Sequence, residues 1–330
     1  MFSRFIIGFG FILLLSSGCS PTPADLEGIS VIKLESDWHF SDLAWSPDGH
    51  SIAATVVDVN NLEGSIQIIE LQDNSTLSVE NLEERTLYEA IGPNWSPDSC
   101  SLVLYYPSGT FVNDEGNILK PPPYDIVTVD AASGEIIQAV WDGAYATWGI
   151  LPDEVIVVDS DIGRPDEEVP IFIVDLDSGE TRQIAKSEAS LITLSEGLEL
   201  SSSNLLTYMS EDGLRILNLN TGNNIGIIEG GNTLSSPRFS PDGQILAYTE
   251  SNSDPTIDKW SNVIHLVDAT NPSCRGDALD LGYVIKSIDW SPDGKQIVFS
   301  TTKPGELYFI DMTTGVGKEW FNSYKERCQN

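Results

Sequence analysis

A five-residue turn motif, in which an aromatic residue precedes Ser-Pro-Asp-Gly, recurs along this 330-residue chain and constrains its fold more than any other feature. Three copies are complete and a fourth ends in Ser. They begin at the marker residues Trp45, Trp95, Phe239 and Trp290. Pro presets φ for a tight turn, Asp can bond its own backbone, and Gly accepts positive φ. Each copy therefore predicts a hairpin turn, in which the carboxylates build the turn and are not ligands or catalytic acids. These carboxylates are Asp48, Asp98, Asp242 and Asp293.

Strand patterns follow every turn. Alternating apolar runs such as Ser51–Val56 have the period-two pattern of a β-strand. Further along each unit, a segment that starts with Ile or Leu ends in an acid or Asn. These third-strand segments are Ile66–Glu70, Ile126–Asp130, Ile171–Asp175, Leu214–Asn218, Ile264–Asp268 and Leu307–Asp311. Six units at 43- to 60-residue spacing match the repeat of propeller blades. The prediction is an all-β fold: a six-bladed β-propeller of four-stranded antiparallel blades over residues 29–322.

The turn motif and the third-strand pattern together resemble the TolB-like, WD-repeat-like β-propeller family. The resemblance covers nearly all of the chain after residue 28, although two units have degenerate turns. Those turns are Trp148–Asp153 in the third unit and Leu200–Ser203 in the fourth. The resemblance implies the propeller fold and the general capacity of such propellers to dock other proteins. It does not specify a partner or an activity.

Two segments compete to close the ring. A propeller usually closes when a strand from one end of the chain joins the blade formed by the other end. Ile29–Leu34 has apolar residues at the right places for the outer strand of the last blade, and Val316–Phe321 is the competitor. We favour the N-terminal segment, and we expect residues 323–330 to be a C-terminal tail.

The first 18 residues read as a signal peptide. Arg4 precedes an 11-residue apolar or glycine stretch, Phe5–Leu15, which is too short to span a bilayer. The following Ser-Gly-Cys resembles the bacterial lipobox, although Ser16 replaces its usual Leu. We therefore expect Cys19 to be lipidated and residues 19–28 to tether the propeller to the cell envelope. That means the outer membrane in a Gram-negative cell and the outer face of the cell membrane otherwise. An ordinary signal peptide with an incidental Cys is the alternative.

Export would place the remaining cysteines in an oxidising compartment. Adjacent blades could bring Cys274 and Cys328 together, which would leave Cys100 unpaired. One disulfide between Cys274 and Cys328 and three unpaired thiols both remain open at this point.

The chain is strongly acidic, with 50 acidic against 17 basic side chains and a formal charge of −33. Such a charge argues against nucleic acid and against anionic lipid headgroups as partners, since both would be repelled. A solvated acidic surface is the commoner explanation of this charge, and a basic envelope protein or polymer is the candidate partner. We expect a monomer.

Motifs for catalysis or cofactor binding are missing from the sequence. There is no Gly-x-Ser-x-Gly elbow, no zinc spacing of His or Cys, and no phosphate-binding Gly loop, so we predict no cofactor. Asp159, Asp161 and Asp166 form the nearest approach to a calcium loop, but Gly163 and Pro165 break the EF-hand pattern. We interpret this segment as a solvated acidic loop.

The predicted binding face carries the unequal loops between second and third strands, together with the connections between blades. Two of these loops contain Phe111 and Trp260. An aromatic residue also lies seven positions before the marker in four units, at Trp38, Tyr88, Trp141 and Tyr283. These residues could ring the channel mouth as a stacking surface; ordinary packing at strand edges is the alternative.

Two functional hypotheses follow. The first is a lipid-anchored, non-enzymatic module that binds an envelope protein or polymer. The alternative is an envelope lyase or hydrolase with a site in the propeller channel, using carboxylates such as Asp142 or Asp289.

Overall fold

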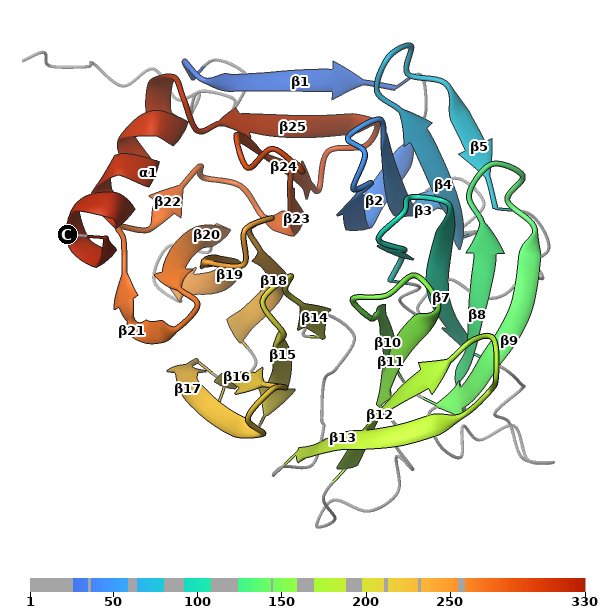
Figure 1. Cartoon of the computed structure of the whole chain (residues 1–330). Helices are drawn as coiled ribbons and strands as arrows, with labels where there is room; N and C mark the ends of the chain where they lie inside the picture. Colours follow the sequence, from blue (N-terminus) through green and yellow to red (C-terminus); the bar gives the residue numbers. More distant parts are fainter. Residues whose placement is uncertain are drawn as a thin grey trace, which may run out of the picture.

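Six antiparallel sheets surround a central axis in the computed structural model (Figure 1). The predicted six-bladed β-propeller is confirmed. The structure describes residues 26–34, 37–58, 64–79, 92–107, 124–143, 145–158, 169–187, 198–210, 213–230, 233–254 and 259–329. The first strand of each blade lies nearest the axis and the fourth lies at the rim (Figure 1).

The blades follow one another in chain order. Blade one contains β2 (Trp38–Trp45), β3 (Ser51–Asp58), β4 (Gly64–Glu70) and β5 (Thr76–Ser78). Blade two contains β6 (Asn94–Trp95), β7 (Ser101–Pro107), β8 (Tyr124–Asp130) and β9 (Ile136–Gly143). Blade three contains β10 (Tyr145–Trp148), β11 (Glu154–Val158), β12 (Val169–Asp175) and β13 (Thr181–Ser187).

The second half of the ring repeats this order, with an extra short strand in blade five and an N-terminal strand as the fourth strand of blade six. Blade four contains β14 (Glu199–Leu200), β15 (Leu205–Ser210), β16 (Gly213–Asn218) and β17 (Asn223–Glu229). Blade five contains β18 (Leu234–Phe239), β19 (Ile245–Asp254), β20 (Lys259–Asp268) and β21 (Asn271–Arg275), and a short β22 (Leu279–Asp280) also pairs with β20. Blade six contains β23 (Ile285–Trp290), β24 (Gln296–Thr301), β25 (Glu306–Asp311) and β1 (Ile29–Lys33).

The motif turns are built as their residues predict. In blade two, the Asp98 carboxylate accepts hydrogen bonds from the Ser96 hydroxyl at 2.6 Å and the Cys100 N–H at 3.0 Å. Ser96 Oγ in turn accepts the Ser101 N–H at 2.9 Å. The Ser96 and Cys100 hydrogen bonds hold the pKa of Asp98 below its usual range. The same Ser-to-Asp bond recurs in the turns of blades one, five and six. These carboxylates therefore stabilise turns.

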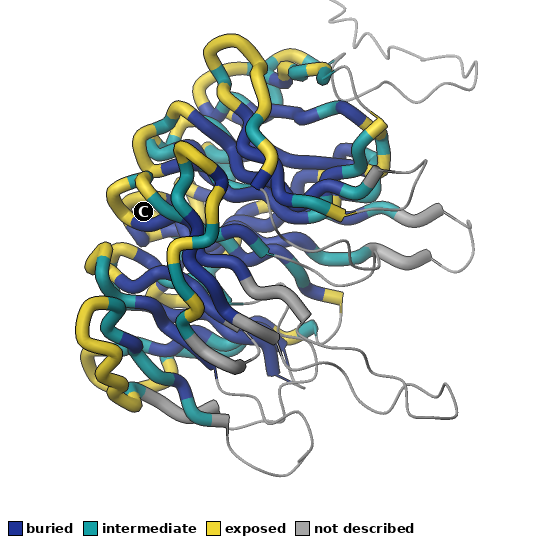
Figure 2. The backbone as a smooth tube through the Cα atoms, turned by 90° about the vertical axis from the view of Figure 1, so that its right-hand side faces the viewer, coloured by how far each residue is buried: buried dark blue, intermediate teal, exposed yellow. Residues whose placement is uncertain are grey.

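The core consists of six apolar clusters, one at each interface between neighbouring blades. Phe40 and Leu43 of blade one, for example, pack with Val298 and Phe309 of blade six. Period-two strands make this possible, because each blade presents one apolar face to each neighbour. Figure 2 shows the buried positions running through the stacked blades, with the exposed positions at the turns.

The N-terminal segment closes the ring, as favoured from the sequence. β1 pairs antiparallel with β25, from Ile29 opposite Ile310 to Lys33 opposite Glu306. The competing strand assignment for Val316–Phe321 is wrong, because these residues lie in helix α1 (Gly315–Cys328). The spacing of Trp320 and Tyr324 at i and i+4 places both buried rings on one helix face. The same helix contains most of the predicted tail 323–330.

A disulfide joins Cys274, in β21, to Cys328 at the end of α1. Asp277 adds polar contacts: its carbonyl accepts the Trp320 indole N–H at 2.8 Å, and its N–H donates to Ser323 Oγ at 3.1 Å. A cross-link over 54 residues stabilises a fold by about 2–4 kcal/mol through restriction of the unfolded chain. Cys100 is a free, exposed thiol. No helix among the described residues has the length and apolar character needed to cross a bilayer.

Candidate functional site

The aromatic residues predicted for the binding face fall into two groups. Trp38 and Tyr283 are half-buried and pack against the clusters on either side of blade six. The carbonyl of Trp38 accepts the Gly305 N–H at 2.8 Å, and Lys303 Nζ lies 5.3 Å from the centre of the Tyr283 ring. The Trp38 backbone and the Tyr283 ring therefore both contact the connection between β24 and β25.

Three other predicted residues lie in strands of which the structure describes only the backbone at these positions. Trp141 and Asp142 lie in β9 and Trp260 lies in β20, but their side chains are outside the described set. Five more predicted positions, together with the lipidation site, lie wholly outside the described residues. These are Tyr88, Phe111, Asp159, Asp161, Asp166 and Cys19.

A cavity of about 400 Å³ lies at the end of the channel where the inner strands enter the motif turns. Antiparallel strand order places this end opposite the loops between second and third strands, so it is not the predicted face. Its walls are the marker residues Trp45, Trp95, Trp148, Phe239 and Trp290. Its rim includes four turn prolines and Ile150. The rim residues Pro47, Pro97 and Ile150 are exposed, so the cavity is open to solvent.

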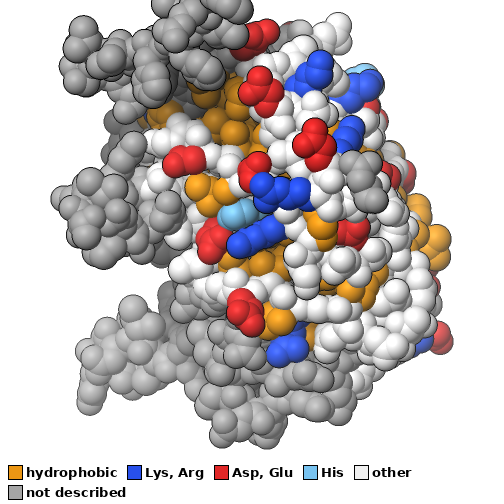
Figure 3. Space-filling view, turned by 90° about the vertical axis from the view of Figure 1, so that its left-hand side faces the viewer, with side chains coloured by type: hydrophobic (Ala, Val, Ile, Leu, Met, Phe, Trp, Pro, Cys, Tyr) orange, Lys and Arg blue, Asp and Glu red, His pale blue; other side chains and the backbone are white. Residues whose placement is uncertain are grey.

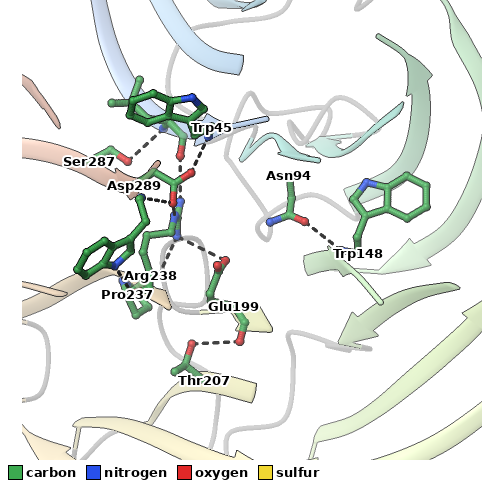
Figure 4. A network of polar contacts seen from close by, with 11 residues as sticks. Trp45, Asn94, Trp148, Glu199, Thr207, Pro237, Arg238, Ser287 and Asp289 are labelled. Carbon is green, nitrogen blue, oxygen red and sulfur yellow. Dashed lines mark hydrogen bonds and ion pairs between the residues drawn. The ribbon is translucent and has the colours of Figure 1, made fainter. Parts of the chain in front are cut away.

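The residue directly before each marker has the same place in every blade and lines this cavity. The six residues are Ala44, Asn94, Thr147, Glu199, Arg238 and Asp289. Blades one to three contribute neutral side chains, whereas blades four to six contribute two acids and one base. Figure 4 shows the three charged side chains lying in a row from Asp289 through Arg238 to Glu199.

Asp289 is held by backbone groups on two blades. Its carboxylate accepts the N–H of Trp45 in blade one at 2.6 Å and the N–H of Trp290 in blade six at 2.8 Å. Arg238 Nε from blade five lies 3.8 Å from Asp289 Oδ1. Arg238 also donates to the carbonyls of Pro237 at 2.9 Å and Leu43 at 3.3 Å. Asp289 and Arg238 therefore connect blades five, six and one.

Glu199 is held differently. Its carboxylate lies 4.0 Å from Arg238 Nη1, beyond hydrogen-bond distance. Its side chain is only 15% exposed, and no residue that the structure describes donates a hydrogen bond to it. Its backbone carbonyl accepts a weak bond from the Thr207 hydroxyl at 3.4 Å.

Burial changes the protonation of both acids. Removal from water raises the pKa of Glu199 to about 8; Arg238 opposes this rise and Asp289 adds to it. Burial likewise raises the pKa of Asp289 to about 6, against the effects of Arg238 and the two backbone N–H groups. At neutral pH the cavity thus contains a protonated Glu199 beside an ionised Asp289–Arg238 pair.

These values predict a pH-dependent stability. Because the folded state holds the Glu199 proton up to about pH 8, stability from this group is present at low pH and is lost as pH rises through 8. Glu199→Gln mimics the protonated acid at every pH. From pH 6 to pH 8, wild type should lose about 2 kcal/mol more unfolding free energy than Glu199→Gln. Urea unfolding at both pH values measures this difference. The exposed control Glu135→Gln should lose the same unfolding free energy as wild type between the two pH values. An equal loss in Glu199→Gln and wild type would contradict the prediction.

The marker tryptophans bind the preceding blade in two ways. In the first, the indole N–H donates to the backbone carbonyl of the residue before the preceding marker. Trp95 donates in this way to Ala44 at 2.9 Å, and Trp290 donates to Arg238 at 3.2 Å. Neither Ala44 nor Arg238 has a side-chain acceptor.

In the second mode, the preceding blade offers a side-chain acceptor, and the marker's backbone N–H uses it. Asn94 Oδ1 accepts the Trp148 N–H at 3.1 Å, and Asp289 accepts the Trp45 N–H. The indole nitrogens of Trp45 and Trp148 are then buried without a hydrogen-bond partner among the described residues. At these four junctions, the residue before the marker therefore selects the contact to the next blade.

Exchanging that residue should exchange the contact. In Asn94→Ala, the Trp148 indole should turn to donate to the carbonyl of residue 94, at a cost of about 1 kcal/mol for the lost side-chain bond. In Ala44→Asn, the Trp95 indole should lose its partner. Indole N–H resonances in ¹⁵N NMR, with their solvent-exchange rates, report both changes; unchanged indole protection in both variants would refute the rule.

Comparison with solved structures identifies the fold. TolB from Acinetobacter baumannii matches with a TM-score of 0.52 and 16% sequence identity, over 78% of this chain and 66% of that one, just under two thirds of its length. A protein assigned as TolB from Agrobacterium tumefaciens matches with a TM-score of 0.54 and 15% identity, over 87% and 98% of the two chains. A chain of the mitotic checkpoint complex matches with a TM-score of 0.51 and 14% identity, over 93% and 98%.

No protein-family model and no curated protein matches this chain. The structural matches agree with the propeller resemblance seen in the turn motif and the third strands. At these levels of sequence identity the matches establish the fold only, and any activity has to be argued from the residues of the site. The chain has a TolB-like β-propeller fold.

Proposed function

We propose that this protein is a non-enzymatic envelope module that binds a partner protein at the turn end of its propeller channel. In this proposal the lipid on Cys19 anchors the chain and the propeller presents the cavity. The fold suits such a role, since one of its structural neighbours is a chain of a multi-protein complex and two others are TolB proteins.

One observation carries the proposal: exposed apolar residues stand beside an open, partly charged cavity. Ile150 is 41% exposed and Leu151 is 51% exposed. Both lie in the degenerate turn of blade three, where blades one, two, five and six have Pro-Asp. Exposed apolar residues next to a recess with aromatic walls and a few charged groups are typical of protein-binding surfaces.

The flank of the propeller that carries α1 has a different character. Acidic, basic and His side chains are interspersed there (Figure 3). Arg327 of α1, for example, is ion-paired with Asp277. A surface of this kind has no single-sign field to select a partner, which favours the channel end as the recognition site.

Capture from native envelopes tests the proposal. The purified full-length lipoprotein, reconstituted with its anchor, should retain a defined partner, and Ile150→Ser/Leu151→Ser should lose it. Ile137→Ser is the matched control, because Ile137 is 55% exposed on β9 and does not line the cavity. Equal retention by all three proteins would refute binding at this face. Loss of the partner after alanine substitution of Trp38, Tyr88, Trp141, Trp260 and Tyr283 would instead assign it to the opposite face.

The enzymatic alternative has one observation in its favour, since two carboxyl groups with raised pKa share the cavity. Asp289 is poorly suited to proton transfer, because both of its oxygens already accept backbone N–H groups. Turnover of glycans or peptides that Asp289→Asn and Glu199→Gln both abolish would replace the binding proposal with a lyase or hydrolase. The screen should be run with and without calcium, which also tests the acidic loop at Asp159.

A further inference from the structure

We propose that the cavity receives a Lys or Arg side chain of the partner and that Glu199 binds its charged group. This inference rests on the proposed function and specifies the chemistry of the partner at the channel end. It follows from the charge balance of the cavity, from the different bonding of its two acids, and from its walls.

The charge balance leaves room for one more cation. Two carboxylates face a single guanidinium, so full ionisation of the cluster leaves one uncompensated negative charge in a buried setting. The charged groups that face Glu199 from the described chain are Arg238 on β18 and Asp289 on β23. Burial raises the pKa of Glu199 to about 8, so this group holds a proton at neutral pH. A partner's ammonium or guanidinium group would take the place of that proton.

The bonding of the acids decides which of them is available. Asp289 uses both oxygens for the N–H groups of Trp45 and Trp290 and cannot turn to a ligand without breaking a contact between blades. No residue in the described part of the chain donates a hydrogen bond to the Glu199 carboxylate, which faces Arg238 across 4.0 Å. This carboxylate can therefore accept a charge-assisted hydrogen bond from a ligand while the structural pair stays intact.

The walls suit the remainder of a basic side chain. The cavity volume of about 400 Å³ lies within the range of roughly 300–1,000 Å³ for small-ligand pockets. The marker tryptophans and the turn prolines give apolar walls for a methylene stem, as long basic side chains require. The exposed Ile150 and Leu151 would contact an apolar residue next to the inserted base. The acidic chain, at −33, would attract such a segment.

N-acetyl-lysine amide is the probe for this site, and N-acetyl-norleucine amide is its uncharged counterpart. Both are titrated into the ¹⁵N-tryptophan-labelled full chain, and binding is read from indole N–H shifts. We expect the lysine probe to bind and the norleucine probe to leave the shifts unchanged. Because the probe keeps its charge below about pH 10, its affinity should follow Glu199 ionisation and rise up to about 100-fold from pH 6 to pH 9.

Variants separate this site from non-specific attraction to an acidic protein. Glu199→Gln should weaken the lysine probe at pH 9 by at least about 10-fold, as loss of a charged hydrogen-bond partner predicts. Glu135→Gln removes the same charge from an exposed site and should bind as wild type does. Equal affinity in wild type and Glu199→Gln, or an affinity that is independent of pH, would overturn the proposal. Thermal unfolding of each variant at pH 6 confirms that the proteins compared are folded.

Partner capture distinguishes failure of this inference from failure of the proposed function. A partner that is lost with Ile150→Ser/Leu151→Ser but retained by Glu199→Gln would leave the proposed function standing and reject the basic side chain. A lysine probe that binds through Glu199, with no partner retained by any version of the protein, would support the site and reject the proposed function.

Discussion

A chain that begins at residue 35, and so lacks β1, is expected to lose most of its folding stability. β1 supplies the fourth strand of blade six and is paired along its full length with β25. It also buries Ile29 and packs Val31 and Ile32 against two different inter-blade clusters. Partial burial of these side chains contributes about 5 kcal/mol, a large share of the total of about 5–15 kcal/mol for a domain.

Loss of β1 would also expose the edge of β25. Unpaired strand edges recruit other chains, so aggregation should accompany the fall in stability. The N-terminal segment additionally holds the start of α1, because the Glu27 carbonyl accepts the Val316 N–H at 2.9 Å. Calorimetry of chains starting at residues 26 and 35, with hydrogen exchange of β24 and β25, measures the effect. Equal melting temperatures would show that the ring closes without this strand.

Arg238→Met is expected to destabilise the protein by about 3–5 kcal/mol at pH 8, the usual effect of removing one member of a buried ion group. Arg238 faces both Asp289 and Glu199, and it donates to carbonyls on its own blade and on blade one. Its loss would leave two buried acids without a counter-ion. It would also weaken the junction of blades five, six and one.

The effect should depend on pH in a defined direction. At pH 5 both acids are protonated in the folded variant, so the loss of charge compensation costs less and the destabilisation should shrink. Lys286→Met is the control, because Lys286 is an exposed base on the neighbouring strand β23. Denaturant unfolding of wild type and both variants at pH 5 and pH 8 measures the loss of unfolding free energy at each pH. An Arg238→Met defect of the same size at both pH values would show that packing dominates, not charge.

Much of the fold follows from the sequence because its signals are local. A Ser-Pro-Asp-Gly turn uses bonds between residues two to five positions apart, such as Ser96 to Asp98 and to Ser101. Five of the six third-strand segments end in an Asp or Asn whose side chain caps the next turn, and all six segments match observed strands. Val316–Phe321, the competitor for ring closure, lies in helix α1, because its few apolar residues fit either a strand or a helix period. Contact with Gly276 and the disulfide at Cys328 favoured the helix.

The candidate site was only partly visible in the sequence. Asp289 was named for the alternative function, whereas Glu199 and Arg238 were missed. A signal was present, since both residues directly precede a marker position and align with Asp289 between repeats. The degenerate turn at Leu200 obscured the alignment in blade four. Ile150 and Leu151 likewise appear in the sequence as a degenerate turn, and only the structure shows that they are exposed beside the cavity.

The sequence alone determined the repeat, the turns and the number of blades, because these depend on contacts within a few residues and on strand periodicity. Only the tertiary structure decided which strand closes the ring, where the last helix packs, and which charges meet in the channel. Glu199, Arg238 and Asp289 come from three different blades, and their distances, burial and protonation exist only once the ring is closed. Radial packing of the blades, which no local pattern encodes, creates that site.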